Sequence, residues 1–238
     1  MVCNTRTLGR CCYTIGGQVL PAKIYIEPMG FAIPRLYAII DPARAGGRSP
    51  AIVARELLLA GVQLMQIRDK HASTRQLYAT SVEIRQVLEG SYCAWIVNDR
   101  VDVARAGRAD GVHLGQEDLP VEKARLVLAP HQCIGCSTHS LEQVLEADQT
   151  SADYIAFGPI FPTPSKEKPD PVVGLQGLRE ARRATRKPLV AIGGINLRNA
   201  REVLAAGADS VAVIGDLLSA PDIQARAREF LSVLGTGA

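Results

Sequence analysis

The sequence lacks any long hydrophobic run. None approaches the ~18 to 20 consecutive apolar residues that a membrane-spanning helix needs, which argues against a transmembrane protein. It also has little excess charge, because 27 Lys and Arg stand against 24 Asp and Glu, a formal net charge of +3. This excess is too small and too evenly spread for a nucleic-acid-binding surface. Basic residues are therefore expected to matter only at a particular site.

A secretion signal and a cysteine-rich metal site are missing as well. The N-terminus has no continuous apolar core, so we expect a cytoplasmic protein whose six cysteines are free, structural thiols. Residues 133–136 read Cys-Ile-Gly-Cys, but no second pair follows at metal-site spacing. On a strand these two thiols would point to opposite faces. Metal or redox use of the pair stays the alternative.

Apolar residues make up 47% and charged residues 21% of the 238, which is typical of a globular protein. Residues 1–32 show no clear helical or strand period, and Met29 offers an alternative start. We expect an N-terminal extension over 1–32, with disorder as an open option, followed by one domain over 33–238.

From Leu36 onward, short β-rich runs alternate with segments of helical period. Asn196, for example, is a candidate N-cap for a helix that contains Ala200 and stops at Gly207. Eight such units over about 200 residues predict an α/β fold, a (β/α)8 TIM barrel. A doubly wound sheet is the rival, but no glycine-rich dinucleotide loop follows an early strand. The expected strands are 36–40, 64–68, 93–97, 111–114, 132–136, 154–158, 188–192 and 210–214.

Barrels place their chemistry at the C-terminal ends of the strands. After the second strand, Gln66, Arg68 and Lys70 share one face, which we expect to point into the barrel mouth. An amide and two cations suit a phosphate or diphosphate. The alternative is a salt-bridge cluster at the rim that involves Asp69.

Two carboxylates follow the next two strands. Asp99 ends the third, and Asp118 comes shortly after the fourth, so the two could approach one another. Beside a phosphate site, they predict a Mg²⁺ ion held by both carboxylates and by substrate phosphates. The alternatives are a helix cap at Asp99 and a plain turn residue at Asp118.

The fifth strand leads to Ser137, His139 and Ser140. Ser140 with Gln143 spells a capping box, while His139 is either a site residue or a packed histidine. His113, inside a short apolar strand, is expected to be structural.

A second anion site is expected near the last strands. The loop after the sixth strand, residues 158–174, is long and rich in proline, as lids and binding loops often are. Gly193 and Gly194 stand before a predicted helix, where backbone N–H groups can bind an anion, and Gly215 follows the eighth strand. Two anion sites in one mouth fit a donor with a diphosphate leaving group and a phosphorylated acceptor, with electrostatic stabilisation of the departing diphosphate.

The motifs resemble thiamine phosphate synthase (thiamine-phosphate pyrophosphorylase), in order from about Leu36 to about Leu217. That family is a (β/α)8 barrel transferase of thiamine biosynthesis. It joins hydroxymethylpyrimidine diphosphate to a thiazole phosphate with Mg²⁺, by a dissociative course. The motifs are 66–70 (QIRDK), 97–104 (VNDRVDVA), 111–120 (GVHLGQEDLP), 158–166 and 192–195 (IGGI).

The resemblance implies a role for each matching residue. It places the pyrimidine diphosphate on Gln66, Arg68, Lys70, Asn98, Ser137 and Lys166, with Lys166, Ser137 and Arg68 acting in catalysis. Mg²⁺ would lie on Asp99 and Asp118. Thr163, Ser165, Gly194 and the backbone of Ile214 and Gly215 would contact the thiazole phosphate.

Two positions depart from that family's pattern. Ser165 replaces a threonine and keeps the hydroxyl, whereas Gly215 replaces a serine and loses it. Asp216 adds a negative charge beside the same anion site. The alternatives are the related thiazole tautomerase, an isomerase that would use His139, and a non-catalytic phosphate-binding barrel. Small phosphorylated molecules are the expected partners, without nucleic acid or membrane, and a homo-oligomer is one option.

Overall fold

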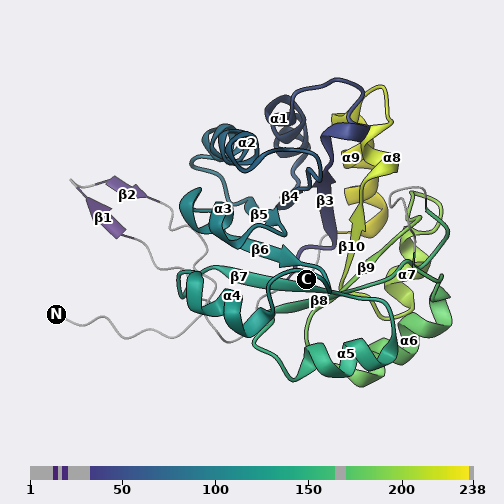
Figure 1. Ribbon diagram of the computed structural model, residues 1–238. Coiled ribbons are helices and arrows are strands. Elements are labelled where there is room, and N and C mark those ends of the chain that lie inside the picture. The colour runs from purple at the N-terminus through teal and green to yellow at the C-terminus, as the bar shows by residue number, and fades with distance from the viewer. Residues whose placement is uncertain (1–12, 16–17, 21–32, 164–169, 236–238) are drawn as a thin grey trace.

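The computed structural model describes residues 13–15, 18–20, 33–163 and 170–235. Eight parallel strands close into a barrel in the order β10-β3-β4-β5-β6-β7-β8-β9 (Figure 1), which confirms the predicted (β/α)8 fold. They are β3 (Leu36–Ile40), β4 (Leu64–Ile67), β5 (Ala94–Asn98), β6 (Gly111–Leu114), β7 (Cys133–Thr138), β8 (Tyr154–Phe157), β9 (Leu189–Ile192) and β10 (Ser210–Val213). Each coincides with an expected strand to within two residues at either end.

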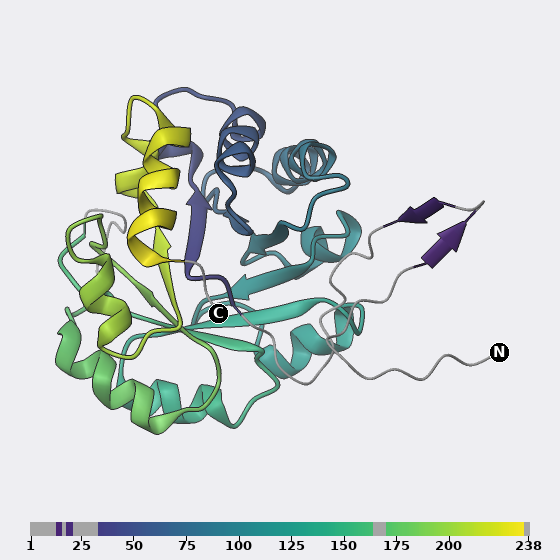
Figure 2. The same cartoon turned by 180° about the vertical axis from the view of Figure 1, so that it is seen from behind.

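The helices surround the barrel, as the two opposite views show (Figures 1 and 2). They are α1 (Pro50–Ala60), α2 (Thr74–Val87), α3 (Val101–Ala106), α4 (Val121–Val127), α5 (Leu141–Asp148), α6 (Gly174–Ala184), α7 (Ala200–Ala205), α8 (Gly215–Leu218) and α9 (Ile223–Leu234), with a 3-10 turn at Pro42–Arg44. Almost every residue of the barrel strands is buried, because helices cover the outside while side chains fill the inside. None of the helices in the described ranges is long and apolar enough to cross a membrane.

Local sequence signals explain several helix ends. Ser49 precedes α1 with Pro50 at its first position, and Gly61 ends it in the left-handed conformation, with φ 98°. Ser140 caps α5 by accepting the N–H of Gln143 at 3.3 Å. The expected reciprocal capping box is wrong, however, because the Gln143 side chain accepts the N–H of His139 instead.

The barrel closes by pairing its last strand with its first. Val211 of β10 lies opposite Leu36 of β3 in a parallel ladder. Outside this seam α9 packs beside α1, and Arg35 donates a 2.5 Å hydrogen bond to the carbonyl of Leu234. The two ends of the fold therefore support one another.

The N-terminal part contains two short strands that the sequence did not predict. β1 (Tyr13–Ile15) and β2 (Gln18–Leu20) pair antiparallel in a sheet of their own, and the first barrel strand begins only at Leu36. Most of residues 1–32 lie outside the described ranges, so the boundary between an extension (1–32) and a barrel domain (33–238) stays a prediction.

The cysteines of the barrel are free and buried, as expected. They are Cys93, Cys133 and Cys136. Burial raises the pKa of the Cys93 and Cys133 thiols well above their ordinary value, which keeps them protonated and unreactive.

Candidate active site

A cavity of ≈ 790 Å³ opens at the C-terminal ends of the barrel strands. Most of the residues that the sequence singled out line it. They are Gln66, Arg68, Lys70, Asn98, Asp99, Asp118, Ser137, His139, Thr163, Gly194, Ile214 and Gly215. Two further predicted site residues, Ser165 and Lys166, lie outside the described residues.

The side chain of Gln66 points into the barrel, as expected from the alternation of side chains along β4. Gln66 is 2% exposed, and its amide nitrogen donates to the hydroxyl of Tyr37 at 2.6 Å. One Arg68 nitrogen donates to the carboxylate of Asp41 at 2.8 Å. Lys70 pairs with Asp99. An amide and two cations thus converge on one wall of the cavity, and each cation is held by a carboxylate.

Asp69 does not form the predicted alternative, a rim ion pair with its neighbours. Its carboxylate accepts the backbone N–H groups of His71 and Ala72, both at 3.0 Å. It therefore shapes the turn between β4 and α2 that carries Lys70, which is a typical use of aspartate in a turn.

Asp99 and Asp118 lie together at the cavity wall, close enough for Asp99 to act on the ionisation of Asp118. The alternative of a helix cap at Asp99 is wrong, since α3 follows Arg100 and no side chain caps it. Asp99 has φ 62°, an uncommon conformation for a side-chain-bearing residue and one often found at functional sites. Asp118 also accepts the N–H of Gly115 at 2.7 Å, so it has a turn role in addition.

Burial raises the pKa of the Asp118 carboxyl, and the neighbouring Asp99 carboxyl raises it further. Two acidic groups this close resist ionising together, and the charge of Lys70 only partly offsets this effect on Asp118. The pair thus provides oxygen ligands of the kind that a hard divalent cation prefers.

His113 and Ser137 meet inside the barrel. The His113 Nε2 atom lies 2.9 Å from the Ser137 hydroxyl, and its Nδ1 atom lies 3.1 Å from the Tyr154 hydroxyl. His113 is 7% exposed and also lines the cavity. The expectation of a purely structural histidine therefore misses its position at the site.

His139 also faces the cavity. Its Nδ1 donates to the carbonyl of Gly158 at 2.6 Å, and its Nε2 lies 3.6 Å from a carboxylate oxygen of Asp170. Of the two alternatives for His139, the structure favours a site residue over a packed histidine.

The loops after β8 and β9 touch at the far side of the cavity. Gly194 has φ 64°, and a Cβ there would lie 2.6 Å from the Pro162 carbonyl oxygen, so only glycine fits without strain. The expected helix directly after the glycines is wrong, because α7 begins at Ala200 with Asn199, not Asn196, as its N-cap. A turn comes between them, in which the Asn199 side chain accepts the N–H of Asn196 at 2.8 Å.

Gly215 and Asp216 follow β10. A Cβ at Gly215 would meet no atom of the described residues within 4 Å, so the described part of the cavity has free space there. Asp216 is paired with Arg226 at 2.6 Å and accepts the N–H of Leu197 at 3.1 Å. The negative charge beside the expected anion site is thus neutralised, and it holds α9 and the β9 loop in place.

Several residues at the site were not predicted from the sequence. Asp41 is the partner of Arg68, and its position directly after the first strand was a usable signal. Tyr37 and Tyr154 had no such signal, because a tyrosine within a β-rich run is typical of ordinary core. Arg44 and Gln116 line the cavity as well.

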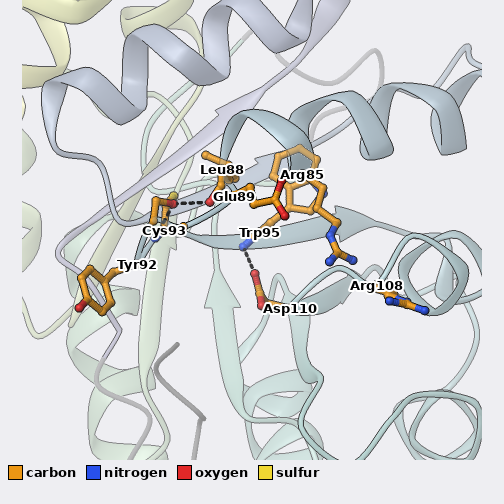
Figure 3. Close-up of a pocket in the computed structure, with 10 residues that line it drawn as sticks. Arg85, Leu88, Glu89, Tyr92, Cys93, Trp95, Arg108 and Asp110 are labelled. Carbon is orange, nitrogen blue, oxygen red and sulfur yellow. Dashed lines mark hydrogen bonds between the residues drawn. The ribbon is translucent and has the colours of Figure 1, made fainter. Parts of the chain in front are cut away.

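A second, smaller cavity of ≈ 280 Å³ lies at the opposite end of the barrel, where β5 and β6 begin (Figure 3). Two of its polar side chains are used in local structure. The carboxylate of Asp110 accepts the N–H of Trp95 at 2.9 Å, and Ser91 donates to the carbonyl of Leu88 at 2.7 Å. It contains none of the predicted site residues.

Comparisons with known proteins agree with this architecture. The model of the family described as thiamine monophosphate synthase matches residues 36–217. A protein of Koribacter versatilis named thiamine-phosphate synthase is 49% identical over 210 residues, which cover 86% of this chain and 98% of that one. A protein of the same name from Methanospirillum hungatei is 44% identical over 199 residues, covering 84% and 97%.

A solved structure is also similar. The thiamine phosphate pyrophosphorylase of Pyrococcus furiosus matches with a TM-score of 0.76 and 41% identity, over 84% of this chain and 95% of that one. The match to the family model covers well over half of the chain, and several relatives exceed 40% identity. The chain belongs to the thiamine monophosphate synthase family.

Proposed function

We propose that this chain is a transferase that couples 4-amino-2-methyl-5-hydroxymethylpyrimidine diphosphate with hydroxyethylthiazole phosphate. The products are thiamine phosphate and pyrophosphate. One observation carries the proposal: a single cavity gathers a cationic wall, a carboxylate pair and the glycines that follow β9 and β10. The names of the relatives at 49% and 44% identity support the same activity.

The cationic wall would hold the pyrimidine diphosphate. Arg68 and Lys70 supply positive charge for the diphosphate oxygens, and Arg68 is oriented by Asp41. Gln66 and Asn98 offer amide groups, and Ser137 a hydroxyl, at the same cavity. Lys166 is proposed as a further catalytic cation. Negative charge that builds up on the departing diphosphate would be stabilised by these groups without rearrangement.

Asp99 and Asp118 would hold a Mg²⁺ ion, and their chemistry fits one. Two carboxylates that already contact each other are the small all-oxygen set that Mg²⁺ uses when substrate phosphates complete its shell. When bound, the ion would neutralise charge on the diphosphate. Lys70, paired with Asp99, joins the two parts of the site.

The acceptor would lie toward the β8, β9 and β10 loops. Thr163, Ser165, Gly194 and the backbone of Ile214 and Gly215 are proposed to contact its phosphate. In the reaction, the bond between the pyrimidine methylene carbon and the diphosphate oxygen breaks, and its electron pair leaves with the diphosphate. The thiazole nitrogen then gives its lone pair to the same carbon to form the C–N bond.

A direct coupling assay tests the proposal. Purified chain is mixed with both substrates and Mg²⁺, and thiamine phosphate is followed with and without a chelator. We expect chelator-sensitive product, and loss of turnover in Asp99→Ala and Asp118→Ala. Folded protein that forms no thiamine phosphate would overturn the assignment, and full turnover in both variants would overturn the metal site.

The same assay separates the alternative that depends on His139. A thiazole tautomerase would isomerise its substrate without any diphosphate donor, whereas the proposed transferase requires one. His139 lines the cavity and donates to the carbonyl of Gly158, so it is placed where the tautomerase alternative needs it. The cytoplasmic location, a homo-oligomer and the 33–238 catalytic domain stay predictions beside the proposed activity.

A further inference from the structure

A continuous line of polar side chains crosses the barrel interior. The Gln66 amide nitrogen donates to the Tyr37 hydroxyl at 2.6 Å, and that hydroxyl lies 2.9 Å from the Tyr154 hydroxyl. Tyr154 lies 3.1 Å from His113 Nδ1, and His113 Nε2 lies 2.9 Å from the Ser137 hydroxyl. These five residues, here called the cross-barrel network, come from β4, β3, β8, β6 and β7 in that order.

The two ends of the network differ from its middle. Gln66 and Ser137 line the cavity, where both are proposed to hold the pyrimidine diphosphate. Tyr154 is fully buried and is absent from the cavity wall. Tyr37 and His113 reach the wall but are 1% and 7% exposed. The middle of the network therefore joins two substrate-binding side chains that lie on separate strands.

The barrel is built to accommodate this line. A Cβ at Gly135 would lie 2.0 Å from the Tyr154 ring, so the missing side chain makes room for it. The Tyr154 ring stacks on His113 at 5.6 Å and meets Tyr37 edge-on at 6.0 Å. Burial raises the pKa of both tyrosines far above its ordinary value, so each hydroxyl keeps its hydrogen for a hydrogen bond.

The chemistry of the groups gives the line a direction. Each hydroxyl has one hydrogen, and Tyr37 already accepts from Gln66. Within the network, its four contacts and the hydrogens of both tyrosines are used when Tyr37 donates to Tyr154, Tyr154 donates to His113 Nδ1, and His113 Nε2–H donates to Ser137. This arrangement leaves the Gln66 carbonyl oxygen as an acceptor and the Ser137 hydroxyl as a donor toward the cavity.

We propose that Tyr37, Tyr154 and His113 are positioning residues, which fix the Gln66 amide as an acceptor and the Ser137 hydroxyl as a donor for the pyrimidine diphosphate. The inference rests on the proposed function. An aminopyrimidine presents an N–H donor, which fits the Gln66 oxygen, and a diphosphate presents acceptors, which fit the Ser137 hydroxyl. Because one hydrogen-bonded network orients both Gln66 and Ser137, the loss of any hydrogen bond in it should disturb both side chains.

Removal of single hydroxyls tests this proposal. Tyr37→Phe and Tyr154→Phe each interrupt the line and keep the aromatic ring, and Tyr78→Phe on the exposed face of α2 is the matched control. We expect kcat/KM for the pyrimidine diphosphate to fall about ten-fold in each variant, as for the loss of one buried hydrogen bond. The KM for thiazole phosphate should stay within about two-fold, because that phosphate is bound elsewhere.

The double variant Tyr37→Phe/Tyr154→Phe sharpens the test. Residues that act as one unit are not additive, so the double variant should lose little more than either single variant. Independent losses that multiply, or equal losses for both substrates, would indicate packing damage and would overturn the proposal.

A spectroscopic measurement on the protein without substrates separates this inference from the proposed function. Two-bond ¹H–¹⁵N spectra report which ring nitrogen of His113 carries the hydrogen. We expect Nε2–H in the wild type and a shifted tautomer balance in Tyr154→Phe but not in Tyr78→Phe. An unchanged balance in Tyr154→Phe would overturn the network even in an active enzyme. If the wild type formed no thiamine phosphate, the proposed function would be wrong. The spectrum would still test the cross-barrel network, because it is recorded without substrates.

Discussion

Arg68 and Lys70 each rest against a carboxylate at the cavity wall, Asp41 for the first and Asp99 for the second. Such pairing keeps long cationic side chains in place at the proposed anion-binding site. The carboxylates are not equivalent, however. Asp41 is 4% exposed and fixed behind Arg68, whereas Asp99 faces Asp118 as well as Lys70. At the residue scale, the Arg68–Asp41 ion pair is therefore fixed, whereas a metal could reorganise the Lys70–Asp99 pair.

The Asp118→Asn variant tests how much the carboxylate pair lowers the free energy of unfolding. Because the pKa of Asp118 is raised, the folded chain keeps this proton to a higher pH than the unfolded chain does. Stability should therefore decline as pH rises through that interval, and asparagine should remove the decline. Without metal, we expect the Asp118→Asn variant to be at least as stable as wild type at pH 7. In the coupling assay with Mg²⁺, we expect it to be inactive.

Denaturant unfolding between pH 4 and pH 7 measures this effect, with Glu83→Gln on the exposed face of α2 as a charge-matched control. The same pH dependence in Asp118→Asn and wild type would contradict the prediction. Retained turnover would contradict the metal role instead.

Gly215→Ser tests the open space beside β10. Among the described residues no atom lies within 4 Å of a Cβ there, so the fold should accept the side chain. The added hydroxyl would face the proposed acceptor phosphate, and we expect a KM for thiazole phosphate that is lower by about three- to ten-fold. Steady-state kinetics measures it.

Gly194→Ala is the contrasting variant, since its Cβ would collide with Pro162. It should destabilise the chain and raise the same KM. A Gly215→Ser enzyme with a higher KM for thiazole phosphate would show that the space is needed by the substrate.

At the scale of elements, the turn between β4 and α2 links stability to binding. Asp69 accepts two backbone N–H groups, and Ser73 caps α2 in a reciprocal capping box with Gln76. The Asp69 hydrogen bonds hold the segment that carries Lys70, while the capping box of Ser73 stabilises only α2. The two can therefore be separated by substitution.

Asp69→Ala should free two N–H groups and loosen Lys70. We expect about 1 to 2 kcal/mol less unfolding free energy and a higher KM for the pyrimidine diphosphate. Ser73→Ala should cost about 1 kcal/mol and leave KM unchanged. Thermal unfolding and kinetics on both variants measure the difference, and an unchanged KM in Asp69→Ala would contradict the role of the turn.

The strands were predictable because each is a short apolar run that ends close to a glycine or a polar site residue. Elements whose form depends on neighbours were not. The helix after Gly194 begins late because the side chains of Asn196 and Asn199 form a turn first. The approach of Asp99 to Asp118 followed from adjacent strands, whereas the contact between Tyr37 and Tyr154 joins β3 to β8 across the closed barrel. Local sequence holds no signal for such a contact.

At the scale of the whole molecule, the barrel and its cavity are built from residues from Leu36 onward. The match to the family model begins at the same residue. We therefore expect a chain that starts at Met29 to keep a kcat within about two-fold of the full chain, because no site residue is removed. The coupling assay and a thermal melt on both forms measure this. A large loss of turnover in a folded shorter chain would assign residues 1–28 a part in the site.

The pairing of β10 with β3 has a consequence for how the protein is made. During synthesis β3 is the first barrel strand to emerge, but it cannot pair with its second neighbour, β10, until that last strand has left the ribosome. Ala212 and Ile214, which line the cavity, arrive at that same moment. Substrates and metal can therefore bind only to finished molecules, and in the cell their concentrations would favour the completed barrel over its unfinished forms by mass action.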